Sequence, residues 1–212
     1  MQLKSDAQSW GALAKLFHWT IVLLLIAQGA LGLYMVDLPK KPAIIPYYNF
    51  HKSLGITILV LALLRLAWRA LDQHPLYPPT MPRWQVLGAR AGHWLLYTLL
   101  FLVPLSGWWF DSVSALRPTF VWGLFELPKL GGPDPAIPDL KEIAAGRHEF
   151  LFWVLVLVAC GHAAMALAHH FVSRDGLLAR MLPGRPALAN VAATAISPTP
   201  DPPSANQENA DA

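Results

Sequence analysis

The sequence predicts an all-α membrane protein, a four-transmembrane-helix up-down bundle, and three observations lead to this fold class. Hydrophobic residues occupy 55% of the 212 positions and charged residues only 14%, whereas soluble domains carry about 25% charged residues. Four apolar stretches, at 10–36, 49–69, 84–110 and 147–171, reach the roughly 20 residues that a helix needs to cross a bilayer. Segments rich in proline or glycine separate the stretches and interrupt helix formation.

The first stretch, 10–36, is predicted to be a retained helix rather than a cleaved leader. Its apolar run exceeds the roughly 7–15 residues of a signal-peptide core. Tryptophans lie near one end and Tyr34 near the other, as in the aromatic belts of membrane helices. A short polar segment, 1–9, precedes the helix, and a loop with three prolines is expected at 37–48.

The second and third stretches each carry a histidine. His51 lies at the start of 49–69, and His93 lies about ten residues into 84–110. A proline and a glycine near the end of the third stretch are tolerated, because membrane helices accept both residues. The connection that follows, 111–146, is the longest in the chain, and its VWGLFEL segment is expected to form a short interfacial helix.

The fourth stretch, 147–171, carries four of the eight histidines. Fourteen residues separate His148 from His162, and seven separate His162 from His169. At roughly 100° per residue, these three side chains share one face of the helix. Polar residues at membrane depth are costly and tend to mark function. Glycine and alanine surround His162 and leave space for a flat, bulky group beside it.

The basic residues predict the orientation of the bundle. Nine Lys and Arg lie in the N-terminal, second-loop and C-terminal segments with three acids, and the other seven lie in the remaining two loops with seven acids. The positive-inside rule therefore places both termini in the cytoplasm. Residues 184–212 are rich in Ala, Pro, Ser and Asn and are expected to be a disordered cytoplasmic tail. One four-helix domain then covers 10–183.

This orientation gives each histidine a depth. His18 and His162 each lie twelve residues, or about 18 Å, from a charged boundary on the cytoplasmic side. His51 and His148 both lie near the outer ends of their helices. Two depth-matched pairs on different helices are what two haems stacked across a bilayer need, with one neutral imidazole on each side of the iron. A bis-histidine haem has no open axial position, which suits electron transfer.

His93 leaves the cytoplasmic-side pair open. It lies close to the depth of His18, so it can replace His18 as the partner of His162, or contact a haem propionate or a quinone. The single cysteine and the absence of a Cys-x-x-Cys-His motif exclude covalent c-type haem, and no nucleic-acid motif is present. A histidine-based metal-ion transporter is the alternative from another class, although the spans offer almost no carboxylates to assist it.

Five motifs, taken in order, resemble the bacterial cytochrome b561 family over about residues 10–183. They are FHW at 17–19, NFHKSLG at 49–55, RAGHWLLY at 90–97, the His-x13-His spacing from 148 to 162, and ALAHH at 166–170. Members of this family are four-helix di-haem proteins, related to the cytochrome b subunits of nickel–iron hydrogenases and formate dehydrogenases.

The resemblance implies two non-covalent haem b groups with four axial ligands to iron: His18, His51, His148 and His162. It favours His18 over His93, and it places a quinone such as ubiquinone near the cytoplasmic-side haem, with His169 as the candidate contact. It also implies a multi-pass protein of the bacterial inner membrane that passes electrons between a periplasmic donor and the quinone pool of the respiratory chain.

The donor is less closely defined by the resemblance. One branch of the family is similar to a superoxide oxidase, for which cations near the outer haem, such as Lys52, Lys141 and Arg147, would attract the anion. A periplasmic redox protein is the other candidate donor. The alternative within the family is a haem-bearing membrane anchor subunit of a dehydrogenase or hydrogenase.

Overall fold

Four long helices form the protein in the computed structural model, which describes residues 2–39, 41–79, 81–114 and 118–183. They are α1 (Ala12–Val36), α2 (Ile45–Leu71), α3 (Arg83–Val113) and α4 (Leu140–Ala168). All four are long and apolar enough to cross a membrane, which confirms the predicted class of fold. The expected disordered tail, 184–212, lies outside the described residues.

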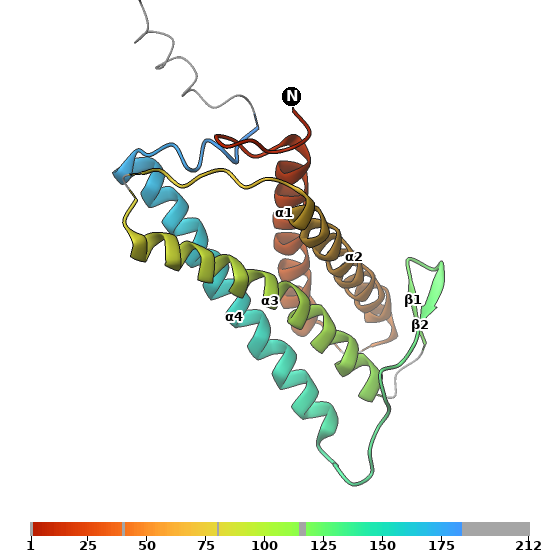
Figure 1. Ribbon diagram of the computed structural model, residues 1–212. Coiled ribbons are helices and arrows are strands. Elements are labelled where there is room, and N and C mark those ends of the chain that lie inside the picture. Colours follow the sequence, from red (N-terminus) through yellow and green to blue (C-terminus); the bar gives the residue numbers. More distant parts are fainter. Residues whose placement is uncertain (1, 40, 80, 115–117, 184–212) are drawn as a thin grey trace, which may run out of the picture.

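The helices pack in an antiparallel bundle in which α1 lies against α2, α2 against α3, and α3 against α4 (Figure 1). A small buried cluster joins the first three helices and is made of Ile21, Leu54, Ile58, Ala62, Tyr97 and Leu100. Most other large apolar side chains are exposed on the outside of the bundle. Such a surface suits lipid, because in a bilayer the helices satisfy their own backbone groups and can present apolar side chains outward.

Two helices begin earlier than the sequence indicated. A short 3₁₀ turn, Pro42–Ile44, leads directly into α2 at Ile45, so the predicted loop 37–48 is shorter than expected. Pro46 lies in the first turn of α2, where a missing backbone N–H costs nothing, since the first N–H groups of a helix have no partner within it. Helix α4 begins at Leu140, seven residues before the apolar stretch.

The interfacial helix expected in VWGLFEL is wrong, because the segment forms a β-hairpin. Strands β1 (Thr119–Val121) and β2 (Phe125–Leu127) pair antiparallel, with Val121 opposite Phe125. Trp122, Gly123 and Leu124 form the turn. Trp122 and Gly123 have positive φ angles of 51° and 74°, a conformation that glycine adopts at little cost. Thr119 and Val121 point inward while Phe120 is exposed, and this period of two is a strand pattern.

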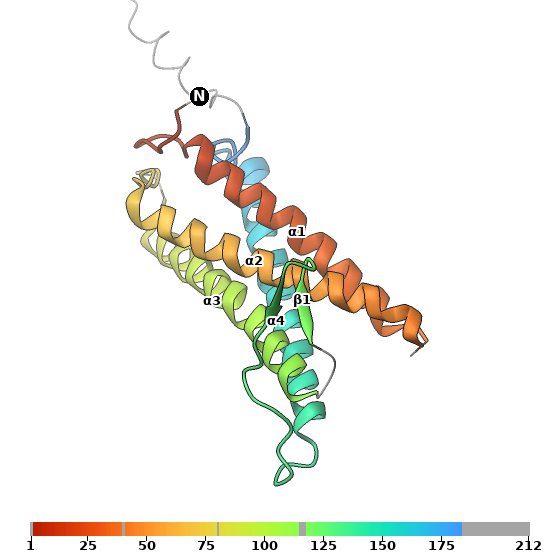
Figure 2. The ribbon, with the colours of Figure 1, turned by 90° about the vertical axis from the view of Figure 1, so that its right-hand side faces the viewer.

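The hairpin is fastened to α2. The Trp122 backbone N–H donates to the Ser53 hydroxyl at 3.0 Å, and the Trp122 indole N–H donates to the Thr57 hydroxyl at 3.0 Å. Ser53 and Thr57 lie roughly 200–240° around α2 from His51, at about 100° per residue. The hairpin therefore packs on the face of α2 turned away from that histidine, and Figure 2 shows it next to this helix.

The two ends of the bundle differ in what they carry. The terminal end is where α1 begins and α4 finishes, and the hairpin end carries the β-hairpin (Figure 1). At the terminal end, the Ser5 backbone N–H and hydroxyl donate to the Asp72 carboxylate at 2.9 and 2.5 Å. The Trp19 indole donates to the Met181 carbonyl at 3.0 Å. Helix α4 continues there into one π-helical turn, His169–Ser173.

Candidate functional site

The structure brings His51 of α2 and His148 of α4 together at the hairpin end. Their ring centroids lie 6.4 Å apart and the rings are 88° from parallel. Both helices begin at this end, at Ile45 and Leu140, so each histidine lies in about the second turn of its helix and the two share one depth. We call these residues the hairpin-end pair.

Helix α3 holds the His148 ring in place. The Nδ1 atom of His148 lies 3.1 Å from the Val103 carbonyl oxygen and 2.9 Å from the Ser106 hydroxyl. A carbonyl oxygen can only accept a hydrogen bond, so His148 must carry its proton on Nδ1 to bond to Val103. The Ser106 hydroxyl donates its own hydrogen to that same carbonyl at 2.7 Å, so its oxygen is free to accept from the same N–H. The Nε2 atom is then the nitrogen with a free lone pair, which is the arrangement seen in metal-ligating histidines.

Two glycines leave room for the hairpin-end pair. A Cβ atom at Gly107 would lie 2.9 Å from His148 Cε1, and one at Gly32 would lie 3.2 Å from His51 Cε1. The first distance is too short for a real Cβ and the second is tight. One turn before Gly32 on α1, the Gln28 side-chain amide donates to the His51 backbone carbonyl at 2.9 Å. Helices α1 and α3 therefore seat the two rings by close approach.

The second pair lies at the terminal end, where His18 of α1 faces His162 of α4. Their ring centroids are 6.5 Å apart at an interplanar angle of 74°. His93 of α3 is also close, with its centroid 5.1 Å from that of His162. The His93 Nδ1–H donates to the Ala89 carbonyl at 2.6 Å. We call His18 and His162 the terminal-end pair, with His93 as a third imidazole beside it.

The separations test whether a bis-histidine metal fits. A metal ion between two opposed imidazoles places their centroids roughly 6 Å apart, because each metal–nitrogen bond is about 2 Å and each ring nitrogen lies about 1 Å from its centroid. The 6.4 and 6.5 Å separations meet this requirement, whereas the 5.1 Å between His93 and His162 is short for it. The Nδ1 atoms of His18 and His51 are also buried without a hydrogen-bond partner among the described residues.

The donor set fits haem better than a metal ion bound by protein alone. Among the residues described, no group of three or more His, Cys, Asp or Glu side chains could hold a metal ion. Two histidines per site are nevertheless sufficient for haem, because the porphyrin supplies four nitrogens itself. Each pair could therefore hold the iron of one haem on both sides, which leaves no position for oxygen.

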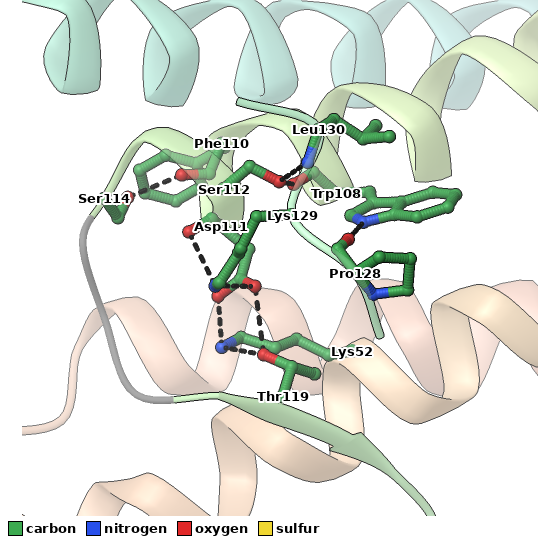
Figure 3. Close-up of polar contacts among 10 residues, drawn as sticks. All are labelled: Lys52, Trp108, Phe110, Asp111, Ser112, Ser114, Thr119, Pro128, Lys129 and Leu130. Atoms are coloured by element: carbon green, nitrogen blue, oxygen red, sulfur yellow. Dashed lines mark hydrogen bonds and ion pairs between the residues drawn. The ribbon is translucent and has the colours of Figure 1, made fainter. Parts of the chain in front are cut away.

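An ion-pair network at the hairpin end joins α2, the end of α3, the hairpin and the segment that follows it (Figure 3). The Asp111 carboxylate is 5% exposed and lies 2.5 Å from the Lys52 ammonium and 2.7 Å from the Lys129 ammonium. The Thr119 hydroxyl of the hairpin donates to the same carboxylate at 2.9 Å. Lys52 directly follows His51 in the sequence. Its positive charge is compensated by the Asp111 carboxylate. The other predicted outer cations, Lys141 and Arg147, are exposed.

His169, the candidate quinone contact, lies in the π-helical turn at the terminal end. Its Nδ1 atom is 2.5 Å from the Asp175 carboxylate, and its side chain is 11% exposed. A π-helical turn at the end of an α-helix often accompanies a functional site. His169 is on the same helix and seven residues beyond His162, so it lies one to two turns closer to the chain termini.

Several side chains around the pairs were not identified from the sequence. Ser106, Gln28 and Gly32 gave no signal, because polar and small residues are common in membrane helices and only the fold brings them to a ring. Gly107 was noted only as a possible interruption of the helix. Arg65 gave no signal either, because an arginine near the end of a membrane helix often extends to the surface, whereas in the structure its guanidinium lies 5.4 Å from the centre of the Tyr97 ring.

Comparisons with known proteins identify relatives over most of the chain. The family model described as prokaryotic cytochrome b561 matches residues 9–184. Cytochrome b561 homolog 2 of Escherichia coli is 32% identical over 186 residues, covering 86% of this chain and 95% of that protein. A probable superoxide oxidase CybB of Yersinia pestis is 30% identical, covering 78% of this chain and 91% of that protein. Cytochrome b562 of Cereibacter sphaeroides is 30% identical, covering 78% and 89%.

Proposed function

The chain belongs to the prokaryotic cytochrome b561 family, and we propose that it carries electrons through two b-type haems from a donor at the hairpin end to a quinone at the terminal end. Membership makes it a multi-pass bacterial membrane protein that binds haem b and transfers electrons. The haem supplies the one-electron chemistry, and the protein supplies its ligands, its orientation and its electrostatic surroundings.

The ligands follow from the two pairs. His51 and His148 would hold one haem, and His18 and His162 the other, because both separations suit an iron between two imidazoles. His93 is too close to His162 to share an iron with it in that way. Its Nδ1–H bond to the Ala89 carbonyl leaves Nε2 available to contact the haem edge or a quinone.

The quinone would bind at the terminal end near His169. Reduction of a quinone to a quinol takes two electrons and two protons, so a buried acid–base group near the site is required. The pair formed by His169 and Asp175 would hold and pass on a proton, because a hydrogen-bonded imidazole and carboxylate are groups used for general acid–base transfer. With nine bases in the terminal-end segments, the positive-inside rule places this end in the cytoplasm.

Superoxide is one candidate donor at the hairpin end. Each superoxide would give one electron and leave as dioxygen, so two are consumed per quinol formed. The similarity to a probable superoxide oxidase supports this donor. The exposed Arg147, whose guanidinium lies 5.4 Å from the centre of the Trp109 ring, is a cation next to His148 that would attract the anion. A periplasmic redox protein, which would dock on the same end, is the other donor.

The histidine separations carry this proposal, and a reduced-minus-oxidised visible spectrum tests it. We expect sharp b-type bands, and a haem-to-protein ratio of two from the pyridine haemochrome. A ratio of one would remove one of the two sites, and protein purified without haem after expression with haem supplied would refute the cytochrome function. Stopped-flow mixing with superoxide would then distinguish the two candidate donors. If superoxide is the donor, the haems should be reduced rapidly without a partner protein.

The alternatives make different demands. A histidine-based metal-ion transporter needs several ligands converging at one depth, and the described part of the chain offers no such cluster. A membrane anchor subunit of a dehydrogenase would co-purify with a larger enzyme and would not reduce quinone alone. Quinone reduction by the purified chain with a small-molecule electron donor would therefore argue against the anchor role.

A further inference from the structure

Arg65 is a charged residue inside a membrane-spanning helix. It lies on α2 six residues before the helix ends at Leu71, and its side chain is partly buried. Placing an arginine at membrane depth costs several kcal/mol, so it normally has a partner or a function. An arginine near a helix end often extends its guanidinium to the membrane surface, but in the structure the Arg65 guanidinium packs on Tyr97, a residue of the core.

The guanidinium packs on an aromatic residue that adjoins the terminal-end pair. It lies 5.4 Å from the centre of the Tyr97 ring, and Tyr97 is only 6% exposed. Tyr97 follows His93 by one turn of α3, and the His93 ring lies 5.1 Å from that of His162. Tyr97 also packs in the buried cluster with Ile21, about one turn after His18 on α1. The positive charge is thus held against the core beside the helical turns that carry the two imidazoles.

No carboxylate compensates this charge among the described residues. The ion pairs found there involve Lys52, Lys129 and His169, and none involves Arg65. The contrast with Lys52 is informative, because that lysine has the buried Asp111 as its partner. A desolvated guanidinium without an anion is unfavourable, so the site is electrostatically complete only when an anion binds beside the histidine pair.

Arg69 provides a natural comparison one helical turn away. It contacts Tyr97 and Trp10 from 5.7 and 6.0 Å, so it has the same charge, the same helix and one shared neighbour. It lies one turn nearer the end of α2 and contacts Trp10, which precedes α1, whereas His18 lies six residues inside α1. Substituting either arginine should therefore perturb the local packing in a similar way while changing the field at the terminal-end pair very differently.

We propose that Arg65 is a positioning residue that binds a carboxylate of the terminal-end haem and raises the reduction potential of that haem. The inference rests on the proposed function. Haem b carries two propionates, and a guanidinium can bind a carboxylate through two parallel hydrogen bonds. A nearby positive charge favours the reduced iron, which carries one positive charge fewer, and this effect is strong where water is excluded. The electron is thereby drawn from the hairpin end toward the terminal end.

Potentiometric titration of the haem-loaded protein tests the proposal with Arg65→Gln, Arg65→Lys and the control Arg69→Gln. We expect Arg65→Gln to lower the midpoint potential of one haem only, Arg65→Lys to restore most of the shift, and Arg69→Gln to resemble wild type. His162→Ala, which should lack the terminal-end haem, identifies which midpoint belongs to the hairpin end. Redox-difference infrared spectra with haem ¹³C-labelled at the propionates should show a shifted carboxylate band in Arg65→Gln alone.

Each outcome of these titrations supports or overturns the proposed role of Arg65. Unchanged midpoints in Arg65→Gln, or equal shifts of both midpoints in Arg65→Gln and Arg69→Gln, overturn the proposal. If Arg65→Gln loses a haem, recovery of that haem in Arg65→Lys supports the role of the charge, and equal loss in both variants overturns it. A wild-type protein without two b-type haems would instead refute the proposed function, so the two failures are distinguishable.

Discussion

The two ends of the bundle hold histidine pairs at nearly the same separation but surround them differently. At the hairpin end, α3 fixes the tautomer of His148 through Val103, and the charge of Lys52 is compensated by Asp111. At the terminal end, a third imidazole lies beside the pair and Arg65 has no anionic partner among the described side chains. Equal ligand geometry can therefore serve different roles, because the second layer of residues sets the charge and the exchange of protons.

The largest expected effect is the loss of a whole haem at one end. His51→Ala should remove the hairpin-end haem and His162→Ala the terminal-end haem, because each leaves an iron with one protein ligand. The haem-to-protein ratio should fall from two to one in each variant, and His93→Ala should retain two. If His93→Ala lost a haem while His18→Ala did not, the terminal-end pair would be assigned wrongly.

Removing the charge of Asp111 should destabilise the hairpin end and leave the terminal end unchanged. Asp111→Asn leaves two partly buried lysines facing one another, and breaking a buried ion pair from one side costs about 3 kcal/mol. We expect a lower thermal midpoint for release of the hairpin-end haem in detergent, with the terminal-end midpoint potential unchanged. The variant Thr119→Val is the milder control, because it removes one hydroxyl donor and no charge. Equal effects on both haems would contradict the independence of the two ends.

The glycine contacts give a graded series. Gly107→Ala should strain the seat of His148, since its Cβ would lie 2.9 Å from the ring, and overpacking of this kind costs about 1–3 kcal/mol. Gly32→Ala, at 3.2 Å from His51, should cost less, and Gly92→Ala should cost little because nothing lies within 4 Å of its Cβ position. Thermal unfolding midpoints of the haem-loaded variants would measure the order, and a reversed order would mean that backbone shifts absorb the strain.

The smallest expected effect lies at the terminal end, in the contact between Ser5 and Asp72. Burial by itself would raise the pKa of Asp72, but hydrogen bonds from the Ser5 hydroxyl and backbone N–H outweigh it and hold the pKa below its ordinary value. The contact should therefore contribute about 1 kcal/mol of stability above the unfolded carboxyl pKa of about 3.9.

That contribution is lost as the pH falls through the folded pKa, because the protonated carboxyl no longer accepts both hydrogen bonds. Asp72→Asn should lower the melting temperature of the holoprotein at pH 7, and the difference from wild type should shrink below about pH 4. A difference that persists unchanged in acid would show that the ionised carboxylate is not what stabilises this end.

The fold class was predictable from the sequence because each membrane helix can be recognised from its own residues. Backbone groups in lipid must be satisfied within the helix, so a span is a continuous apolar run whose length and class can be read locally. The same reasoning failed for residues 121–127, where the turn at Trp122 and Gly123 and the contacts to Ser53 and Thr57 select a hairpin. A segment of seven residues has too little periodicity to distinguish the two structures.

The sequence by itself predicted the four spans and the relative depth of each histidine, because helical rise and hydropathy act along one chain. Its five motifs carried the resemblance to the family, and the resemblance implied haem b. Only the tertiary structure decided which rings face one another, that His93 approaches His162 to 5.1 Å, and that Arg65 turns inward toward the terminal-end pair. These features depend on the rotation and spacing of neighbouring helices, which are set by packing between residues far apart in the chain. The assignment of the four axial ligands stays a prediction that the haem counts will test.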